Sequence, residues 1–166
     1  MISRRSMMIG AAAGVAACST TTEQDAPAYF GPDVTRIQVF KEQRKMQLLH
    51  NDKLLRQYDV ALGFNPRDHK QQEGDGRTPE GAYVINRQNP NSRFHLSIGI
   101  SYPNAVDVAR ARAMGVHPGG DIFIHGTPAP WIGMPDWTWG CIAVSNTEMD
   151  EVYSMVQLGT KIFIYA

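Results

Sequence analysis

The sequence predicts a mostly β domain, a compact β sandwich or barrel-like fold with one or two short helices. Short runs of β-branched and aromatic residues recur from residue 36 onward, and turn-forming residues separate them. Only one long stretch has the apolar spacing of an amphipathic helix. The chain has 166 residues, and the roughly 140 that follow an N-terminal leader suffice for a single core.

The first half of the domain is expected to be a β-meander followed by a long loop. Strands are expected over residues 36–40, 45–49, 54–62 and 82–85. The polar residues 50–53 supply turn chemistry within the meander. Glycine and proline crowd residues 63–81, which predicts an extended surface loop of the kind that often borders a site.

The second half alternates strands with helical segments. Strands are expected over residues 94–100, 121–125 and 161–165. Residues 104–114 are expected to form a short helix or an irregular excursion. A further helix should begin at Asn146 or Thr147, because either residue can cap the apolar repeat that follows, and Gly159 should end it.

The N-terminal residues predict export. Residues 1–17 form a basic stretch and then a short apolar run, which is typical of a signal peptide. Ser3-Arg4-Arg5 resembles a twin-arginine signal, and Val15-Ala16-Ala17-Cys18 resembles a lipobox. We therefore expect a periplasmic lipoprotein anchored to a membrane through Cys18, with simple secretion as the alternative. Residues 18–33 would be a flexible tether and 34–166 the catalytic domain.

Composition excludes several classes of function. The chain has 16 basic and 16 acidic residues, so no nucleic-acid partner is expected. No His-x-x-x-His pair or Cys-x-x-Cys knuckle occurs, and we expect neither a metal nor another cofactor. Ser97 and Ser145 lack a nucleophile-elbow pattern. We expect a monomer.

Cys141 is the predicted nucleophile. It is the one cysteine of the mature core, where no disulfide partner exists, so it is a free thiol. Alone, it would be interpreted as core packing. His125 lies sixteen positions upstream and can act as a general base, and Gly140 leaves room for a substrate beside the sulfur. We expect such a thiol to react well below the ordinary cysteine pKa of about 8.5.

These residues occur in an ordered set that resembles the L,D-transpeptidase catalytic domain, the YkuD-like family. The set comprises His125-Gly126, Gly140-Cys141-Ile142 and Asn146, with supporting stretches at 74–81, 94–97, 102–104 and 119–126. The resemblance implies attack on an L-to-D linkage of peptidoglycan stem peptides through a thioester on Cys141. It also implies that His125 is the base, that the carbonyl of Gly126 or its neighbour orients the imidazole, and that the N–H groups of Gly140 and Cys141 stabilise the oxyanion.

Substrate contacts are less sharply indicated. We expect them at Trp139, Thr138, His117, His95 and Tyr102. For the histidines the alternative is a structural or solvent-exposed role, and for Trp131, Trp137 and Trp139 it is packing of their loop against the sheet.

Two positions depart from the family pattern. The family more often has histidine where Trp139 stands and arginine where Ala143 stands. Both departures leave the nucleophile and its base in place, but they put the acceptor in doubt. Cross-linking or stem exchange is the expected activity, and hydrolysis of the same linkage, of L,D-carboxypeptidase or amidase type, is the alternative. A wall-binding lipoprotein without turnover is the competing reading.

Overall fold

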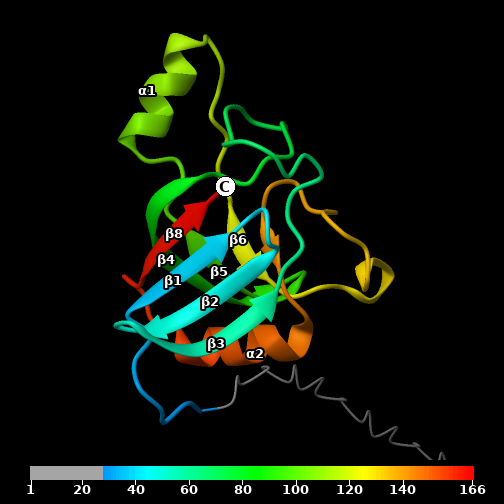
Figure 1. Ribbon diagram of the computed structural model, residues 1–166. Helices are drawn as coiled ribbons and strands as arrows, with labels where there is room; N and C mark the ends of the chain where they lie inside the picture. The colour runs from blue at the N-terminus through cyan, green and yellow to red at the C-terminus, as the bar shows by residue number, and fades with distance from the viewer. Residues whose placement is uncertain (1–27) are drawn as a thin grey trace, which may run out of the picture.

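The computed structural model describes residues 28–166, so the leader and Cys18 lie outside the described residues. Figure 1 shows the order of the elements along the chain. The strands are β1 (Arg36–Phe40), β2 (Lys45–His50), β3 (Lys53–Asp59), β4 (Gly81–Ser92), β5 (His95–Ile100), β6 (Phe123–His125), β7 (Ile142–Ala143) and β8 (Lys161–Tyr165). The helices are α1 (Ala105–Ala113), the 3₁₀ turn η1 (Ala129–Trp131) and α2 (Asn146–Met155). The predicted mostly β fold with two short helices is confirmed.

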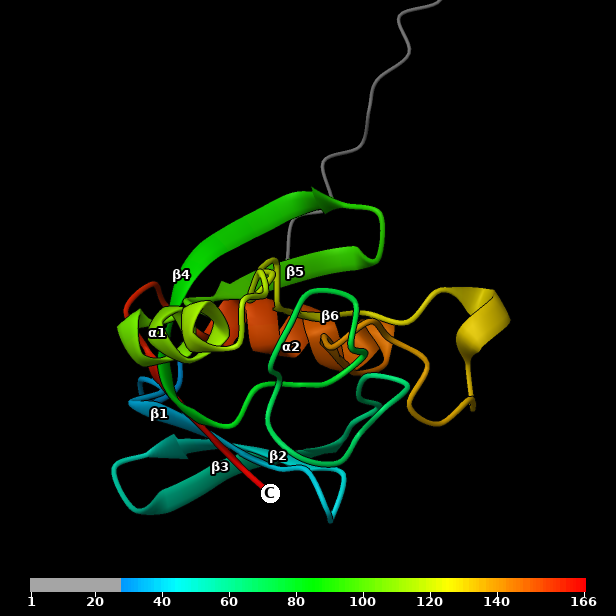
Figure 2. The ribbon, with the colours of Figure 1, turned by 90° about the horizontal axis from the view of Figure 1, so that it is seen from above.

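The strands form a mixed sheet in the order β3-β2-β1-β8-β4-β5-β6-β7. The long strand β4 pairs with β8 through its first half and with β5 through its second, so it joins the two halves of the sheet. Figure 2 shows these halves facing each other with α2 between them. Ala61, just beyond β3, exchanges two backbone hydrogen bonds with Ala143 of β7, which brings the ends of the sheet together. The fold is therefore barrel-like.

Helix α2 fills the space between the two halves. Met149, Val152 and Met155 are buried on one face of the helix and belong to the same apolar cluster as the inward residues of the strands. The predicted N-cap is wrong by one position, since the Ser145 hydroxyl accepts the Glu148 N–H while the Glu148 carboxylate accepts the Ser145 N–H. The helix also ends at Met155 rather than at Gly159.

Strand lengths differ from the expectation where pairing outweighs local sequence. Strand β4 extends to Ser92, far beyond the predicted 82–85, because its second half gains a partner in β5 despite the turn-forming residues it contains. Strand β3 stops at Asp59, before the predicted residue 62. Strand β7 has two residues, too few for an alternating pattern to reveal.

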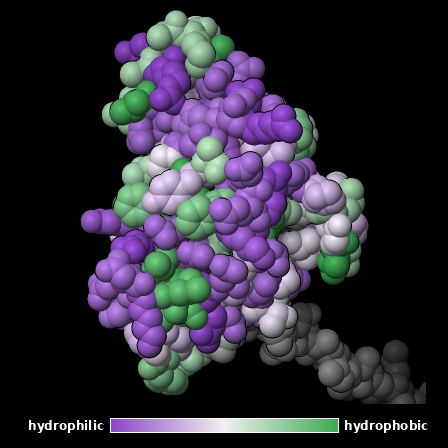
Figure 3. Space-filling model, in the orientation of Figure 1, coloured by the Kyte–Doolittle hydropathy of each residue, from purple (hydrophilic) through white to green (hydrophobic). Residues whose placement is uncertain are grey.

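The face seen in Figure 3 is largely hydrophilic, with hydrophobic areas in small groups. One such group lies on the loop that projects beside the sheet, where Trp131, Ile132 and Met134 are exposed. Within residues 28–166 we find no helix with the length and apolar character needed to span a membrane.

Candidate active site

The turn that carries Cys141 is held by one hydroxyl and one close backbone approach. The Thr138 hydroxyl donates to the Cys141 carbonyl oxygen at 2.7 Å and accepts from the Gly140 N–H at 3.1 Å. Gly140 has φ +122°, and a Cβ on it would lie 2.5 Å from the Arg77 carbonyl oxygen. Only glycine satisfies both conditions, so this position fixes the direction in which the chain enters Cys141.

His125 reaches the same region from the end of β6. Strands β6 and β7 run parallel with His125 paired to Ala143, which places the histidine beside the residues that follow the cysteine. The His125 ring is buried and stacks on Phe94, with 4.7 Å between ring centroids. Trp137 contacts it edge-on at 5.6 Å. These two aromatic rings restrict the rotation of the imidazole.

One hydrogen bond sets the tautomer of His125. Its Nδ1 lies 2.7 Å from the Gly126 carbonyl oxygen, which can only accept, so Nδ1 carries the proton. In the neutral ring Nε2 therefore has a free lone pair, the form that a general base requires. The orienting carbonyl that the family resemblance implied for Gly126 or its neighbour is that of Gly126.

Cys141 and His125 line one cavity of about 430 Å³. Its other walls are Asn89, Asn91, Ser92, Arg93, Phe94, Ser97, Asp121 and Phe123. The Cys141 thiol points to the Asp121 carbonyl oxygen, with 3.5 Å between Sγ and O. The volume lies in the range of small-ligand pockets, about 300–1,000 Å³, so the sulfur and the imidazole face a space that one or two peptide residues can occupy.

Burial disfavours the charged form of both titratable groups, the Cys141 thiolate and the His125 imidazolium. It raises the pKa of the Cys141 thiol, and the nearby Asp121 carboxylate adds to this effect, while a backbone N–H and Lys70 oppose it. Burial also lowers the pKa of His125, although its bond to the Gly126 carbonyl oxygen opposes this change. The resting pair is therefore thiol and neutral imidazole. The expected low thiol pKa is not what the structure gives, because desolvation outweighs the positive groups nearby.

The five predicted substrate contacts lie outside the lining of this cavity. Thr138 supports the Cys141 turn, as described above. His95 pairs with Asp150, with 2.6 Å between Nε2 and Oδ1, and His117 lies 3.1 Å from an exposed Glu73 carboxylate.

The remaining two predicted contacts also have other partners. The Tyr102 hydroxyl donates to the Pro118 carbonyl oxygen, and its ring belongs to the core. Trp139 is 72% exposed and contacts Phe64 edge-on. A role in binding substrate for any of the five stays a prediction.

The tryptophans divide between packing and lining a second groove. Trp131 and Trp137 stack at 5.1 Å and line a groove of about 520 Å³ with residues of the projecting loop and the start of α2. Trp137 lines this groove and also contacts His125, which lines the cysteine cavity, so the groove and the cavity are connected through two adjacent side chains. No cluster of three potential metal ligands occurs among residues 28–166.

Sequence reasoning missed the hairpin residues that wall the cavity. Arg93 and Phe94 sit in the turn between β4 and β5, Asp121 precedes β6 by two residues, and Phe123 begins β6. A sequence signal existed, since residues 94–97 and 119–126 were among the family-like stretches. It did not indicate that these stretches meet at the cysteine.

Comparison with known proteins identifies the family of the chain. Residues 34–164 match the YkuD family model, described as the L,D-transpeptidase catalytic domain. The protein YafK of Escherichia coli (strain K12) is 33% identical over 126 residues, which cover 72% of this chain and 46% of YafK. The chain thus spans about half the length of this curated relative.

Solved structures show the same fold. A point mutant of the helical cell shape determining protein Pgp2 from Campylobacter jejuni aligns with a TM-score of 0.64 and 25% identity, covering 82% of this chain and 48% of Pgp2. Bd1075 from Bdellovibrio bacteriovorus aligns with a TM-score of 0.59 and 25% identity, covering 80% of this chain and 48% of its own. The chain therefore belongs to the YkuD family of L,D-transpeptidase catalytic domains.

Proposed function

We propose that this protein is a cysteine acyltransferase that acts on peptidoglycan stem peptides. The observation that supports this most strongly is the shared cavity of Cys141 and a His125 whose Nδ1–H is held by the Gly126 carbonyl oxygen. That bond leaves Nε2 as the basic nitrogen. Membership of the L,D-transpeptidase family supplies the substrate class.

In the first step His125 Nε2 takes the thiol proton as Cys141 Sγ attacks the carbonyl carbon of the L-to-D linkage. A neutral starting pair suits this route, since the proton moves only as the S–C bond forms. The C–N bond then breaks, the imidazolium gives its proton to the leaving amine, and an acyl thioester remains on Cys141. Attack by an amine completes a transfer, and attack by water completes a hydrolysis.

The developing oxyanion needs a donor near the sulfur. The Gly140 N–H already donates to the Thr138 hydroxyl. Among the backbone hydrogen bonds of the described residues, none uses the Cys141 N–H. We therefore assign the oxyanion contact to the Cys141 N–H, and give Gly140 and Thr138 the task of aiming it.

Two alternatives remain: one changes what accepts the acyl group, and the other involves no acyl transfer. Hydrolysis, as in an L,D-carboxypeptidase, would follow if no amine is held near the thioester, and Ala143 offers no charged group there. A wall-binding protein without turnover would need no basic imidazole beside the sulfur, which disfavours it.

We also propose that the protein is exported to the periplasm and anchored through Cys18. Since Pgp2 is described as determining helical cell shape, an influence on cell shape is part of this proposal.

Incubation with purified muropeptides, followed by mass analysis, tests the activity. New cross-links indicate transfer, and stems shortened by one residue indicate hydrolysis. The Cys141→Ala variant should yield neither product. Unchanged muropeptides with the unsubstituted protein would contradict the proposal. Labelling of cells with a fatty acid that Cys18→Ser abolishes would support the anchor, and label that persists in this variant would contradict it.

A further inference from the structure

A bidentate ion pair ties the turn between β1 and β2 to the segment that leads into the Cys141 turn. Arg44 donates from Nε to Asp136 Oδ1 at 2.9 Å and from Nη2 to Asp136 Oδ2 at 2.7 Å. Asp136 Oδ1 also accepts the Leu62 N–H at 3.1 Å. The side chains of Asp136 and Arg44 are only 18% and 34% exposed. A planar guanidinium that binds both carboxylate oxygens fixes the direction of the carboxylate as well as its distance.

Both partners of this pair have specified backbone conformations. Arg44 has φ +53° and Asp136 has φ +43°, the left-handed region that residues with a side chain seldom adopt. The Arg44 N–H and Nη1 both donate to the Lys41 carbonyl oxygen. The Arg44 carbonyl oxygen accepts the Val60 N–H at 2.9 Å. The guanidinium therefore starts from a turn that is itself held in place, and the pair transmits that position to Asp136.

The two residues that follow Asp136 contact both groups of the proposed reaction. Trp137 contacts the His125 ring edge-on, with 5.6 Å between ring centroids. The Thr138 hydroxyl donates to the Cys141 carbonyl oxygen at 2.7 Å. Because Trp137 and Thr138 follow Asp136 directly, a displacement of Asp136 reaches the imidazole and the Cys141 turn together.

Trp137 depends on this anchor more than Thr138 does. Backbone hydrogen bonds join Thr138 to Leu62 and to Phe64. Within residues 28–166, Trp137 makes no backbone–backbone hydrogen bond, and its buried Nε1–H has no hydrogen-bond partner. The place of the indole is therefore set by ring packing and by the residues on either side of it.

We propose that the Arg44–Asp136 pair positions the base of the acyl transfer. It holds the Trp137 indole against the His125 ring, so that the imidazole keeps the orientation from which Nε2 takes the thiol proton. Neither Arg44 nor Asp136 lines the cysteine cavity, so both act through the residues that they hold rather than on the substrate. The proposal rests on the proposed function and adds two residues on which its chemical step depends.

Steady-state kinetics on a stem peptide tests the pair. Asp136→Asn should lower kcat at least about tenfold with little change in KM, because the cavity keeps its lining while the base is misplaced. Arg44→Gln should lower kcat by a similar factor, and the double variant should be no slower than the slower single variant, because both changes remove one interaction. Arg44→Lys should retain part of the rate, since it keeps the charge without the planar donors. It also replaces Asp136→Asn in the comparison if that variant does not fold.

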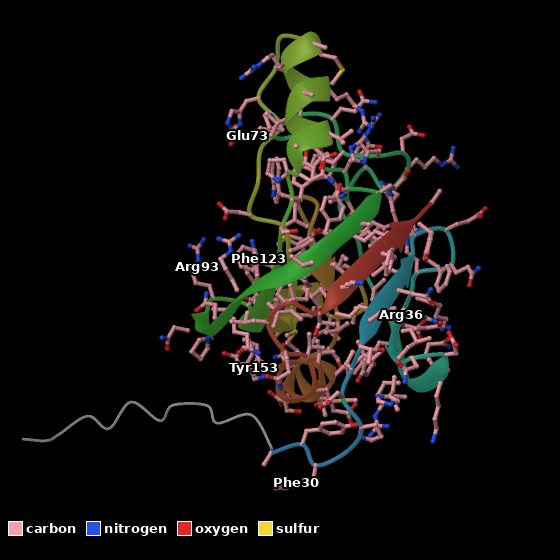
Figure 4. The ribbon with its side chains drawn as sticks, turned by 90° about the vertical axis from the view of Figure 1, so that its left-hand side faces the viewer. Phe30, Arg36, Glu73, Arg93, Phe123 and Tyr153 are labelled. Atoms are coloured by element: carbon pink, nitrogen blue, oxygen red, sulfur yellow. The ribbon has the colours of Figure 1, made fainter. Side chains whose placement is uncertain are left out.

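Asp107→Asn is the matched control, the same substitution at another buried carboxylate. The Asp107 side chain is 4% exposed and accepts the Tyr83 hydroxyl at 3.0 Å, so its loss also disturbs a buried pair. Figure 4 shows its helix α1 at one end of the molecule, away from Phe123 of the cysteine cavity. At a temperature where it stays folded, this variant should keep the kcat of the unsubstituted protein. An unchanged kcat in Asp136→Asn, or an equal loss in both variants, would overturn the inference.

Titration of the His125 ring, followed by NMR, gives a readout that needs no turnover. Burial lowers the pKa of His125, so Asp136→Asn should raise it toward the ordinary value of about 6.5 as Trp137 uncovers the ring. Removal of the Asp136 charge alone would lower this pKa, so the direction separates the two effects. The charged or titratable groups that share the cavity with His125 are unchanged in this variant: Arg93, Asp121 and Cys141. If no stem peptide is turned over, the proposed function fails, and the titration still decides the role of the pair. An unchanged or lowered pKa in Asp136→Asn would overturn the inference.

Discussion

Substitution of Asp75 should weaken the loop that supports the turn carrying Cys141. Asp75 accepts hydrogen bonds from Lys70 Nζ at 2.8 Å and from the backbone N–H groups of Gln71, Gln72 and Arg77. The side chains of Lys70 and Asp75 are only 3% and 10% exposed. The same loop places the Arg77 carbonyl oxygen against Gly140. Asp75→Asn keeps the size of the side chain and removes its charge.

The structure sets the magnitude of this effect. Removing one partner of a buried ion pair costs about 3–5 kcal/mol, because the other charge stays buried. We expect the lower end, about 3 kcal/mol, since Gln71 and Gln72 are exposed and water can replace the lost acceptor at their N–H groups. For a domain of this size that loss corresponds to a fall in Tm of about 10 °C.

Urea unfolding of the unsubstituted protein and of Asp75→Asn measures the difference in their free energies of unfolding directly. Asp52→Asn is the control, because Asp52 pairs with Arg36 at the surface with its side chain 94% exposed, and it should change stability by less than about 1 kcal/mol. A similarly small change for Asp75→Asn would refute the reasoning, because it would mean that Lys70 does not depend on this carboxylate.

The same pair predicts a pH dependence of stability. Burial alone would raise the pKa of Asp75, but the bonds from Lys70 and three N–H groups outweigh it and hold the pKa below its ordinary value. A lowered folded-state pKa stabilises the protein above the unfolded-state pKa of about 3.9, and this contribution disappears as the pH falls further. The stability difference between the unsubstituted protein and Asp75→Asn should therefore shrink below about pH 4. A difference that stays constant there would contradict this assignment.

Two further substitutions and two pH profiles test the site. Gly140→Ala should lower stability by about 1–3 kcal/mol and slow acylation by a stem peptide, because alanine is strained at φ +122°; an unchanged rate in stopped-flow assays would count against it. Because burial raises the pKa of Cys141, alkylation by iodoacetamide should still increase at pH 9, and a plateau below pH 8 would contradict this direction. Because burial lowers the pKa of His125, acylation should decline only below about pH 6.5, where the imidazole gains a proton, and a decline already at pH 8 would contradict it. Asp150→Ala should lower stability by about 1 kcal/mol in thermal unfolding, because it removes the partner of His95. It should also slow acylation, because the turn whose Phe94 stacks on His125 is released, and an unchanged acylation rate would contradict this connection between Asp150 and His125.

The sequence sufficed to select Cys141 and His125 as candidates, which the structure places in one cavity, because each occupies a local motif. Their roles as nucleophile and base stay predictions. His125-Gly126 and Gly140-Cys141 carry their own geometric information, a carbonyl oxygen next to an imidazole and a glycine before a thiol. The strands around the core were likewise predictable, since their alternating residues reflect burial on one face.

The cavity walls could not be predicted in this way. Arg93 and Phe94 reach the cysteine only because β4 extends through turn-forming residues and pairs with β5 with two shifts of register. Non-local pairing of this kind leaves no periodic signal in the sequence. The direction of the Cys141 pKa was missed for a related reason, since desolvation depends on how the whole barrel closes over the sulfur.

Intact-protein mass measurement during turnover of a stem peptide tests the central claim most directly. The account predicts a transient species heavier by the mass of the donor peptide minus that of its leaving amino acid, located at Cys141 by digestion. Cys141→Ala should show no such species, and His125→Gln, which removes the base but keeps the thiol, should form it far more slowly. Product formation without any adduct, or an adduct on another residue, would contradict the account.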